Sequence, residues 1–95
     1  MYQDTATVTV SAEQSAGEVE AVDNENVAIG LEAVTDNLKK VHFTGQLAAP
    51  DAPTHVCITL KNGLSYYGPI VNGHAEPNGG WLAFECDMID PQLLV

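Results

Sequence analysis

The dipeptide Asn62-Gly63 lies between two segments in which apolar and polar residues alternate, His55–Lys61 and Leu64–Val71. Asn-Gly is the strongest short-range signal for a two-residue type I′ turn, because both central residues of that turn need a positive φ. The pattern therefore predicts a β-hairpin. Its expected cross-strand pairs are Leu60 with Ser65, Ile58 with Tyr67, and Val56 with Pro69. Because Pro69 has no backbone N–H to donate, we expect either that its strand lies at an edge or that the pairing ends there.

Residues 25–38 carry apolar side chains at helical spacing. Four of them follow one another at intervals of four, three and four: Val27, Leu31, Val34 and Leu38. This spacing places all four on one face of an α-helix. Lys39 and Lys40 follow near its last turn, where cations are favoured. We predict one amphipathic helix that packs on the sheet through this face.

Three further segments alternate with a period of two, which is typical of strands: residues 5–10, 41–47 and 81–88. In the last of them, one face is apolar: Leu82, Phe84, Cys86 and Met88. Two segments rich in glycine, proline and polar residues are predicted loops: 48–54 and 72–80. We expect residues 11–24 to form an acidic loop, with its mobility left open.

The order of elements is then β-α-β-β-β-β. A chain of 95 residues fits a single domain, residues 1–95. The predicted fold class is α+β, with a mainly antiparallel sheet of four or five strands and one amphipathic helix packed on one face.

The charge of the chain limits its partners. Thirteen acidic residues stand against three lysines and no arginine, and the net charge is −10. A nucleic-acid binder needs cations to displace phosphate counterions, and an anionic membrane repels an acidic protein. We therefore expect no direct binding to nucleic acid or membranes. We expect a protein partner with a basic surface, such as one that holds DNA or RNA; the alternative is that the acidity serves solubility alone.

Partner-binding residues are predicted where acids are dense and bases are absent. Residues 13–36 contain no lysine or arginine. The predicted contact residues are Glu13, Glu18, Glu20, Asp23, Glu25, Glu32 and Asp36, together with the aromatic residues Tyr66 and Trp81. The aromatic residues are included because tyrosine and tryptophan are enriched at interface centres. The alternative is that these rings pack against the helix.

No motif for catalysis, metals or cofactors is found. The histidines and cysteines are scattered, and the segment His74-Ala75-Glu76 offers two metal ligands only. His55 and Cys57 share a strand face, but no glycine turn adjoins them that would bind an oxyanion. We therefore predict no enzymatic activity, no catalytic residue, no cofactor and no metal site.

The stretch Val56–Gly68 reads Val-Cys-Ile-Thr-Leu-Lys-Asn-Gly-Leu-Ser-Tyr-Tyr-Gly. It resembles one segment of small bacteriophage accessory proteins of unassigned function, which carry a similar strand, Asn-Gly turn and strand ending in glycine. The helical half that follows in that family has no counterpart here, where Gly73–Gly80 is a predicted loop. The resemblance implies a phage origin and transfers no functional residue.

Cysteine content and the two ends of the chain bear on its location and assembly. Cys57 and Cys86 lie in apolar contexts, so we predict reduced residues in or near the core, with a single bridge between two strands as the alternative. Met1 is followed by polar residues, so we expect a cytoplasmic protein, in the host cytoplasm if phage-encoded. The apolar segment Leu93-Leu94-Val95 is expected to dock on its own domain or on another copy, which leaves a homo-oligomer open.

These observations favour a small acidic protein-binding module, a phage-type inhibitor that acts as a nucleic-acid mimic. It would occlude the basic nucleic-acid-binding surface of a host defence complex. The alternative is a structural or virion protein such as a capsid decoration subunit. A second alternative is a small-ligand binder or enzyme built around the 72–80 segment.

Overall fold

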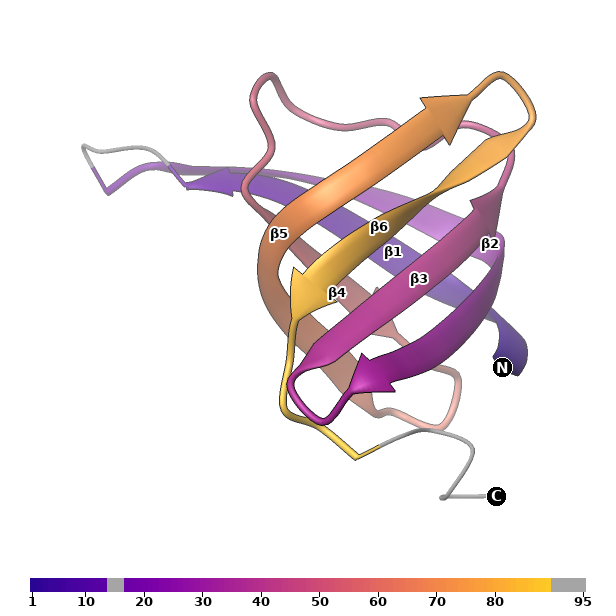
Figure 1. Cartoon of the computed structure of the whole chain (residues 1–95). Helices are drawn as coiled ribbons and strands as arrows, with labels where there is room; N and C mark the ends of the chain where they lie inside the picture. The colour runs from indigo at the N-terminus through magenta and orange to yellow at the C-terminus, as the bar shows by residue number, and fades with distance from the viewer. Residues whose placement is uncertain (14–16, 90–95) are drawn as a thin grey trace.

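The computed structural model describes residues 1–13 and 17–89, and in these residues every regular element is a β-strand. Six strands are present: β1 (Tyr2–Glu13), β2 (Val19–Thr35), β3 (Leu38–Thr44), β4 (His55–Thr59), β5 (Ser65–Glu76) and β6 (Gly79–Glu85). They form a closed antiparallel barrel in the order β1-β2-β3-β6-β5-β4 (Figure 1). The predicted α+β fold is therefore wrong, because the described chain is all-β.

Two three-stranded meanders, β1-β2-β3 and β4-β5-β6, make up the barrel. The connection 45–54 joins them, and two ladders close the seams between them. In one seam β1 residues Thr7–Ser11 pair with β4, and in the other β3 pairs with β6 along its whole length. Closure satisfies the backbone groups that an open sheet would leave at its edges.

Residues 25–38, the predicted helix, lie in β2, the turn after it and the start of β3. Val27 and Leu31 share the inner face of the strand, because four is an even number of residues and a strand has a period of two. Val34 does not belong to the expected buried apolar face, since 49% of its surface is exposed. The backbone of β2 forms hydrogen bonds with β1 on one side and with β3 on the other. This tertiary pairing overrides the helical spacing of the apolar residues.

Two predicted loops are also largely strand. β1 continues through Ser11 to Glu13 and pairs with residues 19–21 of β2, so the described part of segment 11–24 is mostly ladder. Segment 72–80 continues β5, turns at residues 77–78 and begins β6. Its glycines permit close packing between strands: a Cβ at Gly73 would lie 2.8 Å from a methyl carbon of Leu82. Only the 48–54 loop is confirmed.

The hairpin of β4 and β5 is confirmed, but its turn has three residues. The Leu60 N–H donates to the Leu64 carbonyl (2.8 Å), and the Gly63 N–H donates to the Leu60 carbonyl (3.0 Å). Gly63 alone in this turn has a positive φ, 90°. The extra residue shifts the register by one, which exchanges the two faces of β5. The observed pairs are Ile58 with Tyr66, Cys57 with Tyr67, and Val56 with Gly68.

β5 changes its hydrogen-bonding partner next to Pro69. The last pair with β4 is His55 with Pro69, and the first pair with β6 is Ile70 with Phe84. The edge position is wrong, since β5 has a neighbour on each side. The other expectation is confirmed: pairing with β4 ends at Pro69, where the strand passes from one ladder to the other. At this crossing a Cβ on Gly68 would overlap the carbonyl of Glu85 in β6.

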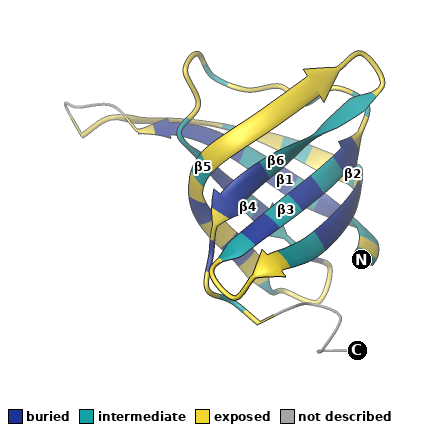
Figure 2. Cartoon of the chain, in the orientation of Figure 1, coloured by how far each residue is buried: buried dark blue, intermediate teal, exposed yellow. Residues whose placement is uncertain are grey.

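The barrel interior is filled by alternate residues of the strands (Figure 2). Its largest fully buried apolar side chains are Tyr66, Phe84, Leu31, Ile58, Val8, Val41 and Val56. The predicted apolar face of the last strand is confirmed: Leu82, Phe84, Cys86 and Met88 all pack in or against this core. Both cysteines are free; Cys86 is buried, whereas Cys57 lies half-buried on the outer face.

Lys39 lies near the start of β3, beside the β2–β3 turn at the lower end of the barrel, with 1% of its surface exposed. Its Nζ donates to the carbonyls of Asp36 (3.0 Å) and Cys86 (3.0 Å), with a longer contact to Thr35 (3.5 Å). A buried ammonium is tolerated only where such bonds replace its hydration. The side chain therefore ties the β2–β3 turn to the chain that leaves β6.

Gly68→Ala is expected to lower the free energy of unfolding by about 3 kcal/mol or more, because the new methyl group meets the β6 backbone. Gly63→Ala is the control: its turn is open, so only the positive φ opposes it, at about 1 kcal/mol. Denaturation followed by Trp81 fluorescence measures both. An equal or larger loss for Gly63→Ala would contradict the tight crossing of β5 over β6.

Lys39→Met keeps the apolar stem but leaves its carbonyl partners without the ammonium, so we expect a loss of about 2–3 kcal/mol of unfolding free energy. The matched control is Lys61→Met in the exposed β4–β5 turn, for which we expect a change within about 0.5 kcal/mol. Urea denaturation of both variants tests this. Equal stabilities would show that the ammonium does not hold the lower end together.

Candidate functional site

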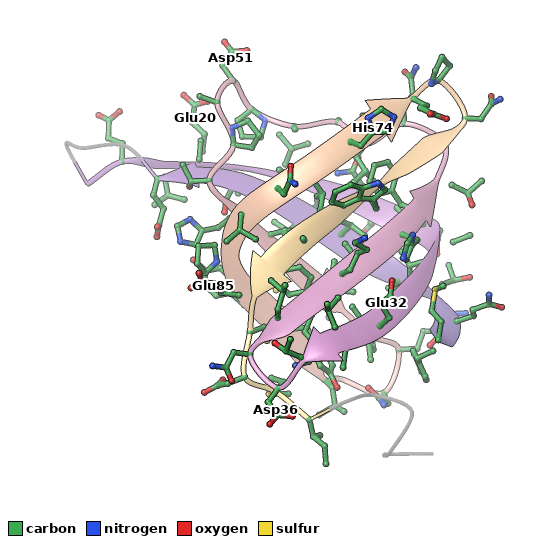
Figure 3. The ribbon with its side chains drawn as sticks, viewed as in Figure 1. Glu20, Glu32, Asp36, Asp51, His74 and Glu85 are labelled. Carbon is green, nitrogen blue, oxygen red and sulfur yellow. The ribbon has the colours of Figure 1, made fainter. Side chains whose placement is uncertain are left out.

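The acids predicted to bind a partner follow β2 from one end of the molecule to the other. In Figure 3, Glu20 lies on the projecting end of the β1–β2 ribbon, Glu32 on the side of the barrel and Asp36 at its lower end. The strand that joins them has 17 residues and curves around the wall. These acids therefore do not form one contact surface, and a partner that meets Glu20 does not also meet Asp36.

Four of the predicted acids lie on the β1–β2 ribbon, here called the arm and defined as residues 10–13 and 17–24 (Figure 1). Its root belongs to the barrel wall, because Val10 and Ser11 also pair with β4, and residues 12–13 and 17–20 extend past the wall. Cross-strand pairing puts Glu13 beside Val19 and Ala12 beside Glu20. Side chains alternate across a strand, so Glu13 and Glu20 point to opposite faces of the ribbon. Glu18 and Asp23 complete the set, and the arm contains no lysine, arginine or histidine.

Some of the predicted acids already have partners within the barrel. A carboxylate oxygen of Glu13 lies 3.1 Å from His55 Nδ1, and one of Glu32 lies 2.7 Å from His42 Nε2. Asp23 accepts a hydrogen bond from the Thr9 hydroxyl at 2.7 Å. Glu18, Glu20, Glu25 and Asp36 are exposed at the surface. Two of them, Glu18 and Glu20, lie on the arm.

The connection 45–54, here called the roof loop, is bonded to the base of the arm. The Asn24 amide donates to the Ala48 carbonyl (2.9 Å) and accepts from the Ala48 N–H (2.8 Å). At the other end of the loop, the Thr54 N–H donates to the Ser11 carbonyl (2.8 Å), and the Glu13 N–H donates to the Thr54 hydroxyl (3.0 Å). These bonds fix the direction in which the arm leaves the barrel.

Tyr66, a predicted contact residue, is not accessible to a partner. It is fully buried, and its hydroxyl donates to the Ile89 carbonyl at 2.6 Å. The three-residue turn of the hairpin explains this, because the register shift turns Tyr66 inward.

Tyr67, and not Tyr66, lies on the outer face of the barrel, and 50% of its surface is exposed. Its ring stacks on His55 with centroids 5.5 Å apart. Partial burial, and then the nearby Glu13 and Cys57, raise the pKa of Tyr67 above its usual 10.0. The residues Glu13, His55 and Tyr67 thus form a row at the base of the arm. Tyr67 was not among the predicted contact residues. Only the length of the β4–β5 turn, which sets the face on which each tyrosine lies, could have revealed it.

Trp81, the other predicted aromatic residue, is half-buried on the outer face of β6. The Nζ of Lys40 lies 4.2 Å from its ring centroid, a cation–π contact. Its ladder neighbours are His42 in β3 and His74 in β5. The Trp81 ring is therefore already in contact with a lysine of the same protein, which does not favour a basic partner at this ring.

A cavity of about 450 Å³, here called the mouth cavity, opens at the upper end of the barrel in Figure 1, between the roof loop and the β5–β6 hairpin. It is lined by Val10, Phe43, Gln46, Leu47, Ala49, Pro53, Ile70, Ala75, Glu76, Pro77 and Leu82. Glu76 is its one charged lining residue, and its carboxylate lies 3.0 Å from His74 Nε2. The predicted 72–80 segment thus contributes to a cavity as a strand hairpin.

Residues 1–13 and 17–89 contain no candidate metal site and no candidate membrane-spanning helix. There, histidines, cysteines and acids form no group of three or more that could hold a metal ion. That part of the chain also has no helix long and apolar enough to cross a membrane. The segment Leu93-Leu94-Val95 lies outside it. Comparison of the sequence and structure with protein-family models, curated proteins and solved structures gives no match.

Asn24→Ala is expected to release the roof loop, because it removes both bonds to Ala48. We expect exchange of the Ala48 amide hydrogen to accelerate at least about tenfold, with a smaller change in global stability. Asn72→Ala is the matched control, since the Asn72 side chain bonds only the adjacent Gly73 N–H. Amide exchange followed by NMR measures both; an unchanged rate at Ala48 would contradict the role given to Asn24.

Proposed function

We propose that the protein is an acidic protein-binding module whose arm enters a basic groove and occludes a surface that otherwise holds nucleic acid. The observation that carries this proposal is the placement of Glu13, Glu18 and Glu20 on the part of the ribbon that projects past the barrel, with Asp23 at its root. Residues 1–38 contain no lysine or arginine, so the ribbon has no fixed cation of its own to weaken the attraction. An inhibitor of a nucleic-acid-handling host complex would work in this way.

The fixed base of the arm supports this role. A two-stranded ribbon by itself is marginally stable in water. The bonds from Asn24 and Thr54 to the roof loop hold the root of the ribbon before any partner arrives. A preorganised element loses less conformational entropy on binding, so more of the electrostatic attraction is retained as affinity.

The row at the base of the arm adds an aromatic contact. Tyr67 is half exposed and stacks on His55, which is paired with Glu13. Tyrosine is enriched at the centres of protein interfaces, and charged groups are more typical of the rim around them. The acids would then steer the approach and the aromatic ring would add contact area.

The test compares two variants with equal loss of charge. The arm variant is Glu18→Gln, Glu20→Gln, Asp23→Asn; the control is Glu32→Gln, Asp36→Asn, Asp87→Asn, whose residues lie away from the arm, with Glu32 on the side of the barrel and Asp36 at its lower end. The tagged wild type first captures its partner from bacterial lysate at low and high salt. With the purified partner, we expect the arm variant to bind at least about tenfold more weakly and the control within about threefold.

Competition with a labelled oligonucleotide gives a second measurement. The wild-type protein is expected to displace the oligonucleotide from its partner, and added salt should reduce the displacement. Equal weakening by both variants would show that overall charge, and not the arm, drives binding. Salt-insensitive capture of shell proteins would instead favour a structural role such as capsid decoration.

A further inference from the structure

One edge of the arm is covered by the roof loop and the other is open. On the covered side, Thr54 bonds both the Ser11 carbonyl and the Glu13 N–H of β1. The other side is the backbone of β2 residues 19–23, here called the arm edge. β3 pairs with β2 only from Ile29 onward, and within residues 1–13 and 17–89 no other strand pairs with β2 on that side.

The alternation of hydrogen bonds along the ladder identifies the backbone groups at the arm edge. The Ser11 carbonyl points away from β2, since it accepts from the roof loop, so the backbone groups of Val10 point toward β2. Val22, opposite Val10, therefore bonds within the ribbon, whereas the N–H and C=O groups of Ala21 and Asp23 point away from β1. No bond from another described residue reaches these groups. They have the spacing that an added antiparallel strand requires.

Two other strand edges that extend past a neighbour are capped by side chains. The N-terminal half of β1 extends past β4, and there the Thr5 N–H donates to the Asp4 carboxylate (2.8 Å). β5 leaves β4 at Pro69, and the Gly73 N–H donates to the side-chain oxygen of Asn72 (2.8 Å). A donor already bonded within the chain is less available to another strand, so the arm edge is the better template for pairing.

The charges beside the arm edge select the kind of strand that can pair there. A strand added to β2 has side chains on both faces of the ribbon, next to Glu20 on one face and Asp23 on the other. Opposite charges in neighbouring strands are stabilising and like charges are destabilising. A second copy of this arm is therefore disfavoured, because residues 1–38 contain no lysine or arginine.

We propose that the arm edge binds an extended segment rich in lysine or arginine, which adds to β2 as a further strand. Its backbone bonds Ala21 and Asp23, and its basic side chains lie beside the acids of the arm. In this mode of recognition the backbone bonds supply affinity and the side chains supply specificity. The inference rests on the proposed function and specifies how the arm holds the basic surface of its partner.

The test uses a short peptide of alternating lysine and threonine as the probe. One control peptide has glutamate in place of lysine; the other keeps lysine but has every backbone amide N-methylated, so it has the same charge and no backbone donor. Amide exchange of the full-length protein is followed by NMR. We expect the lysine peptide to slow exchange of the Ala21 and Asp23 amides at least about tenfold and to change little at Val22, which is already bonded to β1. Both control peptides should bind at least about tenfold more weakly.

Two variants of one residue separate strand addition from charge. Ala21→Pro removes the outward N–H but keeps every charge and the ladder with β1, so it should bind the lysine peptide at least about tenfold more weakly. Ala21→Thr keeps the N–H and should bind within about twofold of the wild type. Retained protection of the Val22 amide shows that the proline variant is folded.

The inference is overturned if the Ala21 and Asp23 amides gain no protection, if the N-methylated peptide binds as tightly as the lysine peptide, or if folded Ala21→Pro binds like the wild type. Weak binding of the captured partner by the arm variant, together with wild-type binding by Ala21→Pro, would leave the proposed function standing and exclude strand addition. Concentration-dependent dimers formed through the arm edge would also contradict the choice of a basic segment.

Discussion

Closure of the barrel is the constraint on which the rest of the structure depends. Two meanders become one barrel only if β1 pairs with β4 and β3 with β6, and β5 must then pass from one ladder to the next beside Pro69. Gly68 allows that crossing because its lack of a side chain lets β5 touch the Glu85 carbonyl. Strands β1, β2, β5 and β6 are longer than closure requires, and their additional residues extend past the barrel wall. The arm and the β5–β6 hairpin are these extensions, and the arm carries the proposed contact with a partner.

Local sequence patterns predicted part of this fold. Alternation with a period of two correctly indicated strands in residues 5–10 and 81–85, because one face of each is buried in the same core; the predicted strand over 81–88 ends three residues early, at Glu85. The helix over residues 25–38 was wrong, since Val27 and Leu31 fit one face of a helix or of a strand equally well. The ladders on both sides of β2 decide between them, and those contacts are remote in sequence. Asn62-Gly63 marked the hairpin but not its register, because glycine with positive φ serves turns of two or three residues.

The candidate sites were less predictable than the fold. Charge alone indicated the acidic residues, but Asp36 lies at the far end of β2 from the arm, and Glu32 is paired with His42 across a ladder. A one-residue register error exchanged Tyr66 and Tyr67 as the exposed ring. The mouth cavity had no sequence signal, since its lining comes from four strands and the roof loop, far apart along the chain.

Shortening the arm tests most directly whether the barrel serves as the rigid base of an acidic binding element. Residues 12–20 are replaced by Asn-Gly, which can close a tight turn between the paired residues Ser11 and Ala21. The variant is expected to lose binding to the partner captured by the wild type and to keep the β-sheet circular dichroism of the barrel. Undiminished binding by a folded, shortened protein would contradict the account and place the contact surface elsewhere on the barrel.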